Sequence, residues 1–138
     1  MERSEFCKML INAKEKSGIK TSEMSFAIKM LLAALIRFEK GKHNFGMERA
    51  IEYLNIAHAQ ICLEANGISH LVGDYSQLIQ WQIASRTGRY SQRELAELTG
   101  YSRITIVNIE TMKCIISVDM FLKIADVLGY TIKIVDKQ

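Results

Sequence analysis

The order of apolar and polar residues in the first half of the chain recurs in the second half at one fixed separation, and this repeat constrains the fold more than any other feature. We call this separation, which carries Met24 onto Leu95, the repeat offset. Identical residues are few in this comparison, and it is the pattern of residue types that repeats. Further matched positions are Leu35 with Ile106, Phe38 with Ile109, Glu39 with Glu110, Ile51 with Leu122 and Leu54 with Ala125. The pattern predicts two copies of one unit, over residues 1–64 and 74–138, with residues 65–73 as a turn or linker. Because units of this size bury little surface alone, we expect the two to pack together.

The composition favours a helical, globular protein of 138 residues without proline, the strongest helix breaker. The longest apolar run, residues 30–36, is far below the roughly 20 residues that cross a bilayer, so we expect no membrane segment and a cytoplasmic location. A net charge of +3 permits nucleic-acid binding without requiring it. The three cysteines are scattered, without disulfide or zinc spacing, which indicates a reducing compartment and small buried side chains.

The second unit reads as four helices followed by a strand. We expect a helix over residues 75–87, a second over 92–98, a third after residue 102, and a fourth beginning at 117 or 119. Ser91 and Ser102 are good N-caps, and Glu94 gives Ser91 the spacing of a capping box. Residues 131–135 alternate and are rich in branched side chains, which predicts a strand. The expected fold is therefore mostly α.

The spacing between the second and third of these helices is the most specific signal. Two helices that cross steeply through a short turn need a small residue at their contact, which Ala96 provides. They need a residue that adopts positive φ at the corner, which Gly100 provides. Leu95, Ile106 and Ile109 supply the apolar side chains that fill the wedge. The spacing indicates a helix-turn-helix.

Residues 90–110 closely resemble the lambda-repressor/Cro-like (Xre) family of DNA-binding domains, and the resemblance extends through residues 121–129. It implies tandem lambda-repressor-like units, the first degenerate, in a prokaryotic transcription regulator whose partner is double-stranded DNA. The helix over residues 102–111 would lie in the major groove. The resemblance implies that Arg103, Ile104 and Asn108 face the groove, with Ser102, Thr105 and Val107 beside them. It also implies contacts from Gln92 to a phosphate or base and from Lys113 to a phosphate, and an ion pair between Glu110 and Arg86.

The first unit departs from this pattern at two places. Lys29 stands where the corner glycine is expected, which costs about 1 kcal/mol or more and suggests a reshaped turn. By the repeat offset, the residues that would face the groove are Leu32, Ala33, Ile36 and Arg37. These side chains carry almost no hydrogen-bonding groups. Two alternatives remain open. The first unit binds DNA through Thr21, Arg37, Lys40 and Lys42, or it binds a protein through Leu32 and Ile36 on the apolar helix over residues 30–38. In the second case the chain would be a protein-binding module such as an antitoxin or adaptor. We also expect Lys14 to pair with Glu39.

Each unit ends in an alternating strand, and a lone strand is not stable. We therefore expect residues 60–64 to pair with residues 131–135 about a pseudo-twofold axis, so that one chain imitates a dimer. The interface residues would be Ile61, Leu63, Ile132 and Ile134. Asn66-Gly67 is a turn signal, so residues 68–72 are expected to fold back as a hairpin strand. Groove spacing then requires the two reading helices to lie about 34 Å apart. A homodimer of the whole chain remains open.

The sequence gives almost no support to an enzyme. It has no nucleophile–base pair, no glycine-rich phosphate loop and no paired carboxylates on one helix face. Its three histidines, His43, His58 and His70, are far apart, so no metal site is expected. We expect no cofactor.

Overall fold

Short polar caps and left-handed corners divide the chain into helices, as the sequence indicates. In the computed structural model, which describes residues 1–138, the side chains of Asp74, Ser91, Ser102 and Ser117 each accept a hydrogen bond from the backbone N–H three residues later. The helices are α1 (Arg3–Ser17), α2 (Thr21–Ile28), α3 (Leu32–Glu39), α4 (Met47–Ile56), α5 (Tyr75–Arg86), α6 (Gln92–Thr99), α7 (Arg103–Glu110) and α8 (Val118–Val127). The strands are β1 (Ala59–Ala65), β2 (Ile68–Val72) and β3 (Thr131–Asp136). The predicted mostly-α fold is confirmed.

The three strands form one antiparallel sheet in the order β2-β1-β3. β1 and β2 are joined by the predicted hairpin turn, in which Asn66 and Gly67 have φ of 52° and 76°. β3 pairs with the other edge of β1, as predicted, so that Ile61 faces Ile134 and Leu63 faces Ile132. Ile61 and Leu63 are fully buried, so the pairing of β1 with β3 contributes to the hydrophobic core.

A second contact joins the starts of α4 and α8. Met47 N donates to Ile116 O at 2.8 Å, and Val118 N donates to Phe45 O at 2.7 Å. The two bonds are reciprocal and form an isolated antiparallel bridge between Gly46 and Ser117. This bridge had no signal in the sequence, because both segments lie in loops without periodicity.

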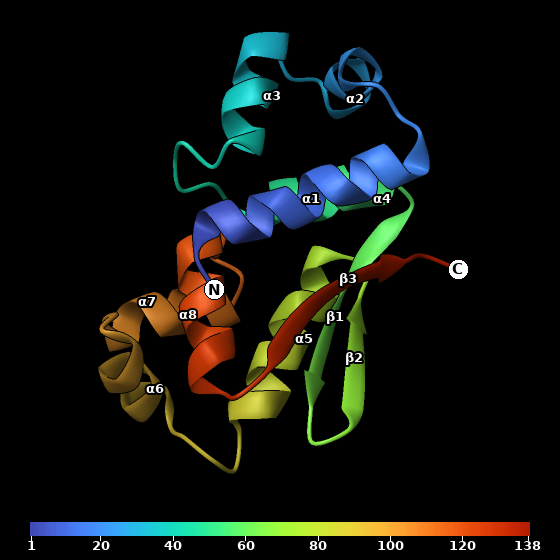
Figure 1. Ribbon diagram of the computed structural model, residues 1–138. Coiled ribbons are helices and arrows are strands. Elements are labelled where there is room, and N and C mark those ends of the chain that lie inside the picture. Colours follow the sequence, from blue (N-terminus) through green and yellow to red (C-terminus); the bar gives the residue numbers. More distant parts are fainter.

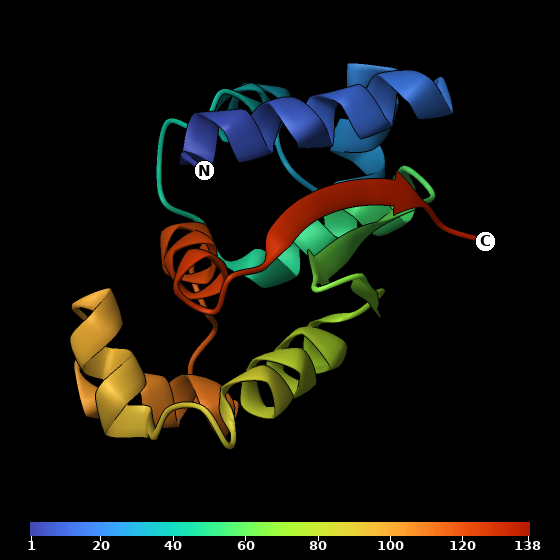
Figure 2. The same ribbon diagram turned by 60° about the horizontal axis from the view of Figure 1, so that its bottom comes forward.

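One core of 32 buried residues runs through both halves of the chain. Phe6 of α1 packs edge-on against Phe121 of α8 at 6.3 Å between ring centroids, and Trp81 of α5 packs against Phe121 at 6.0 Å. Arg3 binds Asp119 at 2.9 Å. Figure 1 shows α1 lying across α4 beside the sheet, with α2 and α3 at the top and α6 and α7 at the lower left. Figure 2 confirms that the two helix pairs lie apart.

The structure corrects three details of the sequence interpretation. The apolar helix expected over residues 30–38 begins at Leu32, because Met30 and Leu31 form the turn before it. Lys29 does not reshape that turn: it adopts the left-handed conformation with φ of 59°, close to that of Gly100 at 80°. Cys114 is exposed, whereas Cys7 and Cys62 are buried as expected.

Candidate nucleic-acid interface

α6 and α7 form the helix-turn-helix that the spacing predicts. Leu95, Ile106 and Ile109 are buried between them, and Ala96 is nearly buried at the contact of the two helices. The capping box at Ser91 is complete: Glu94 N donates to Ser91 Oγ at 3.0 Å, and Ser91 N donates to Glu94 Oε1 at 2.9 Å. The hydrogen bond from the Ser91 backbone N–H, with a smaller contribution from the Ser91 side chain, lowers the pKa of Glu94, since it favours the ionised carboxylate. The start and end of α6 are therefore fixed, which sets the direction of α7.

The outward face of α7 presents Arg103, Ile104 and Asn108. Arg103 is exposed, Asn108 is half-buried, and Ile104 is 69% exposed. The side chains of Arg103 and Asn108 make no hydrogen bond or ion pair within the molecule. α7 packs on α5 and α6, and Figures 1 and 2 show it apart from α1, α2 and α3. The N-terminal half therefore leaves this face uncovered.

The other predicted DNA-contacting residues of the second half are arranged around α7. The hydroxyls of Ser102 and Thr105 lie 2.8 Å apart and are hydrogen-bonded at the start of the helix. Val107 is half-buried beside Asn108. Lys113 is exposed on the loop after α7 and makes no ion pair.

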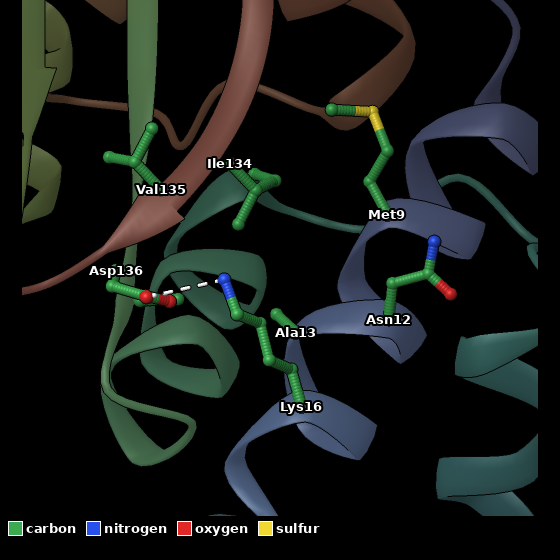
Figure 3. Close-up of a pocket in the computed structure, with 8 residues that line it drawn as sticks. Met9, Asn12, Ala13, Lys16, Ile134, Val135 and Asp136 are labelled. Atoms are coloured by element: carbon green, nitrogen blue, oxygen red, sulfur yellow. Dashed lines mark ion pairs between the residues drawn. The ribbon is translucent and has the colours of Figure 1, made fainter.

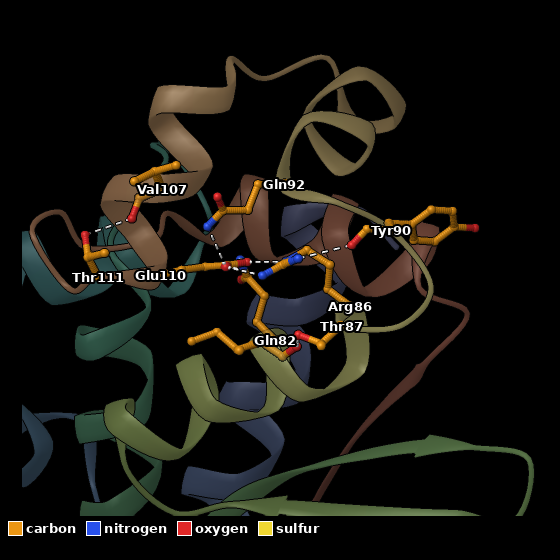
Figure 4. Close-up of polar contacts among 9 residues, drawn as sticks. Gln82, Arg86, Thr87, Tyr90, Gln92, Val107, Glu110 and Thr111 are labelled. Atoms are coloured by element: carbon orange, nitrogen blue, oxygen red, sulfur yellow. Dashed lines mark hydrogen bonds and ion pairs between the residues drawn. The ribbon is translucent and has the colours of Figure 1, made fainter.

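A buried carboxylate, Glu110, holds α5, α6 and α7 together (Figure 4). Arg86 binds it through two nitrogens, at 2.8 Å to Oε2 and 2.7 Å to Oε1, which confirms the predicted pair. Gln92 Nε2 donates to Oε1 at 3.1 Å, and Gln82 Nε2 donates to Oε2 at 3.3 Å. A buried carboxylate needs such partners to remain charged. Gln82 was not singled out from the sequence, because it lies in the interior of a helix without a distinguishing pattern.

The first half holds its four helices together with a similar arrangement around Glu39. Lys14 Nζ donates to Glu39 Oε2 at 2.6 Å, which confirms that predicted pair, and to Thr21 Oγ1 at 2.8 Å. The Tyr53 hydroxyl also donates to Glu39, and burial together with this bond raises the pKa of Tyr53. The structure thus places Thr21 at the start of α2, with its hydroxyl bonded inside the molecule.

The exposed face of α3 differs chemically from that of α7. Leu32 is 48% exposed, Ile36 is 38% exposed, and Ala33 and Arg37 are exposed beside them. Lys40 and Lys42 are exposed at the end of α3 and in the loop that follows. The structure therefore brings Arg37, Lys40 and Lys42 to the surface. Leu32 and Ile36 do not lie at the junction of the two halves, where β1 pairs with β3 and α8 meets α1 and the start of α4.

A small pocket of about 190 Å³ lies between α1 and β3, lined by Met9, Asn12, Ala13, Ala59, Ile134 and Val135, with Lys16 and Asp136 (Figure 3). Lys16 binds Asp136 at 3.2 Å, and both side chains are largely in solvent. The two opposite charges satisfy one another, so the pocket offers one polar side chain without an internal partner, the amide of Asn12. It marks a packing contact between α1 and the last strand.

No group of three or more His, Cys, Asp or Glu side chains is arranged to hold a metal ion. None of the helices combines the length and the apolar character that a membrane crossing requires.

Comparison with known proteins bears on the second half of the chain. No curated protein and no solved structure matches the chain at a significant level. The family match covers the turn before α6, the helices α6, α7 and α8, and most of β3. Residues 88–135 match the helix-turn-helix family of the lambda repressor and Xre type, a family of DNA-binding regulatory domains and not of enzymes.

Proposed function

We propose that this protein is a sequence-specific DNA-binding transcription regulator that places α7 in the major groove. One observation carries the proposal. In a matched helix-turn-helix, the reading helix exposes Arg103, Ile104 and Asn108 together, and the two polar side chains have no partner inside the molecule. A polar side chain without an internal partner keeps its hydrogen-bonding capacity for a ligand.

The three side chains suit three different bases. The Arg103 guanidinium can donate two hydrogen bonds to the O6 and N7 atoms of guanine, and the Asn108 amide can bond adenine at N6 and N7. Ile104 can pack against the methyl group of thymine. A protein that makes these contacts recognises particular base pairs, whereas contacts to the phosphate backbone carry no sequence information.

Contacts to phosphates would fix the position of α7 along the DNA duplex. Lys113 follows the helix on an exposed loop and has no competing carboxylate. Gln92 Nε2 donates one N–H to Glu110, and its second N–H is available to a phosphate oxygen. Ser102, Thr105 and Val107 border the reading side chains, and the two hydroxyls can also accept or donate at the backbone. These contacts carry affinity and salt dependence, not sequence preference.

We further propose that the chain consists of two related units that act as a pseudo-dimer. Several spacings support this. The repeat offset carries the first residue of α2 onto that of α6, the first of α3 onto that of α7, and the first of α4 onto that of α8. The bridge between Gly46 and Ser117 joins positions with the same separation, and the pairs of β1 and β3 are symmetric about Cys62 and Lys133. Lys40 and Lys42 precede that bridge in the first half as Lys113 does in the second, which supports phosphate contacts by all three. The operator would then be an imperfect palindrome with one weakly read half-site.

The test is selection of bound duplexes from a random DNA library, performed with the wild type, Arg103→Ala and Lys8→Ala. Lys8 is exposed on α1, and its removal takes away the same charge far from α7 in the chain. The expected result is a motif containing a guanine whose preference disappears in Arg103→Ala and persists in Lys8→Ala. Absence of any enriched motif with the wild type would contradict sequence-specific binding. A symmetric motif with two equal half-sites would contradict only the unequal pseudo-dimer.

A further inference from the structure

An apolar surface without a covering element lies on α2 and α3. It consists of Phe26, which is 88% exposed, Leu31, which is 83% exposed, and Leu32 and Ile36, with Ala33 between them. Leu32 and Ile36 are one helical turn apart on α3, so they lie on the same face. We refer to these five residues as the α2–α3 apolar surface. Figure 1 shows α2 and α3 at the outside of the molecule.

Folding does not require these side chains to be apolar. At the positions that the repeat offset assigns to them, the helix-turn-helix of the second half carries Glu97, Ser102, Arg103, Ile104 and Val107. Four of those five differ in polarity or size from the first-half residue, and the same helix pair forms. The first half buries Met24, Ile28, Leu35 and Phe38 for its own packing. Large exposed apolar groups beyond that core indicate a binding surface.

Unpaired positive charges lie on α3 and at the ends of α2 and α3, the two helices that carry this surface. Lys20, Lys29, Arg37 and Lys40 are all exposed, and none forms an ion pair. Between residues 20 and 43 the one exposed carboxylate is Glu23, because Glu39 is buried against Lys14. A partner for this surface must therefore bring an apolar ridge and negative charges beside it.

We propose that the α2–α3 apolar surface binds an acidic amphipathic helix of another protein. Such a helix offers apolar residues at positions i, i+3, i+4 and i+7 and carboxylates on its flanks. The apolar residues complement the α2–α3 apolar surface, and the carboxylates complement the four cations on α2 and α3. A second copy of this chain is disfavoured, since it would bring the same four cations against one another. Duplex DNA is disfavoured because Leu31 and Leu32 offer no hydrogen bond to a base edge. The proposal does not depend on DNA binding by α7, but it replaces the weakly read half-site proposed for the first unit, since Leu32 and Ile36 cannot contact a base and a partner helix at once.

The experiment is a selection from a phage-displayed library of random peptides long enough for four helical turns. The bait is the full chain, and the comparison bait is the double variant Leu31→Ser/Leu32→Arg, which introduces the residue types found at the matching positions of the second half. Ile104→Ser, which removes an exposed apolar group from α7, is the matched control. Circular dichroism and urea unfolding establish that all three chains fold alike. Should the double variant fail to fold, Leu32→Gln alone takes its place.

The expected result is enrichment of peptides with apolar residues at helical spacing and flanking Asp or Glu. Their affinity should fall about tenfold or more with the double variant and stay unchanged with Ile104→Ser. In ¹⁵N-resolved spectra the enriched peptide should shift amides of residues 26–37. Three outcomes would overturn the proposal: enriched peptides without acidic residues, peptides that bind the double variant equally well, or no enrichment. Shifts of residues 26–37 with a duplex in place of the peptide would assign the surface to DNA. Loss of DNA binding by Arg103→Ala is scored separately, so failure of one proposal is distinguishable from failure of the other.

Discussion

Cys62 of β1 and Lys133 of β3 are register partners in the antiparallel ladder, and the repeat offset carries the first of these residues onto the second. The ladder is symmetric about this pair, since Ile61 faces Ile134 on one side and Leu63 faces Ile132 on the other. Gly46 and Ser117, which form the second bridge, have the same separation. Both contacts are ones that a rotation exchanging the two units of the proposed pseudo-dimer would map onto themselves. The relationship supports the pseudo-dimer that we propose.

Removing Arg103 and removing Lys113 should weaken DNA binding in different ways. Arg103→Ala should cost about 1–3 kcal/mol of binding free energy and relax the preference at one base pair, because the lost contact is to a base edge. Lys113→Ala should weaken all sequences alike and reduce the slope of log affinity against log salt concentration by about 1, because the lost contact is to a phosphate. Fluorescence anisotropy with the selected duplex and its single-base variants, at several salt concentrations, measures both quantities.

Lys8→Ala is the control for these two variants, since it removes one exposed positive charge from α1. Its effect on affinity should be small at physiological salt, where screening acts within about 8 Å. An equal loss of affinity for every base at every position with Arg103→Ala would contradict the base-reading role. An unchanged salt slope with Lys113→Ala would contradict the phosphate contact.

The ion pair between Arg86 and Glu110 should be costly to break from one side only. The two side chains are 12% and 4% exposed, so Arg86→Met leaves a charged carboxylate in the interior. We expect that variant to lose about 3–5 kcal/mol of unfolding free energy. The double variant Arg86→Met/Glu110→Leu should lose less than Arg86→Met alone, since no buried charge remains. Urea unfolding measures both variants and the Glu110→Leu single variant, and a double-variant loss equal to the sum of the single losses would refute the coupling.

The left-handed conformation of Lys29 predicts a gain in stability on substitution by glycine. Its φ of 59° strains an L-residue with a Cβ, so Lys29→Gly should raise the unfolding free energy by about 0.5–1 kcal/mol. Gly100→Ala should lower it by about 1 kcal/mol, from backbone strain alone, because an added Cβ would meet no atom within 4 Å. Thermal unfolding compares these chains with Lys40→Gly, whose φ of −81° predicts no gain. Stabilisation by Lys40→Gly as large as by Lys29→Gly would exclude the conformational explanation.

The three thiols should differ sharply in reactivity. Cys114 is exposed, whereas Cys7 and Cys62 are buried, and burial raises the pKa of the Cys7 thiol to about 11. Since the thiolate is the reacting form, one thiol should react quickly with an aromatic disulfide at about pH 8 in the native protein, and all three in denaturant. Cys114→Ser should abolish the fast phase. Two fast thiols in the native chain would show that a buried cysteine becomes accessible.

Local signals in the sequence predicted much of the fold and part of the candidate site. Ser91 and Ser102 begin their helices and the Asn66-Gly67 turn joins two strands, and each of these depends on one residue type at one spacing. The pairing of Arg86 with Glu110 was expected from the family resemblance, and that of Lys14 with Glu39 from the repeat. The apolar run over residues 30–36 gave no such guidance, because apolar residues at every position carry no period. Only the structure shows that Leu35 alone of that run is buried.

Other features depend on how distant segments meet. The bridge between Gly46 and Ser117 requires two loops to meet, and no residue type marks them for that role. Gln92 was expected to contact DNA, and the structure shows that its amide is also bonded to Glu110. Its side chain connects the reading helix to the interior as well as facing the surface. The exposure of Cys114 likewise follows from a loop whose course no periodicity predicts.

The strand order β2-β1-β3 has a consequence during synthesis of the chain. β1 and β2 leave the ribosome well before residues 131–136, which form the strand that completes their sheet. Until then one edge of β1 has unpaired backbone groups, and such an edge can pair with other chains. A nascent or truncated polypeptide that ends before β3 therefore exposes a template for aggregation, and synthesis of β3 determines whether the chain stays dispersed.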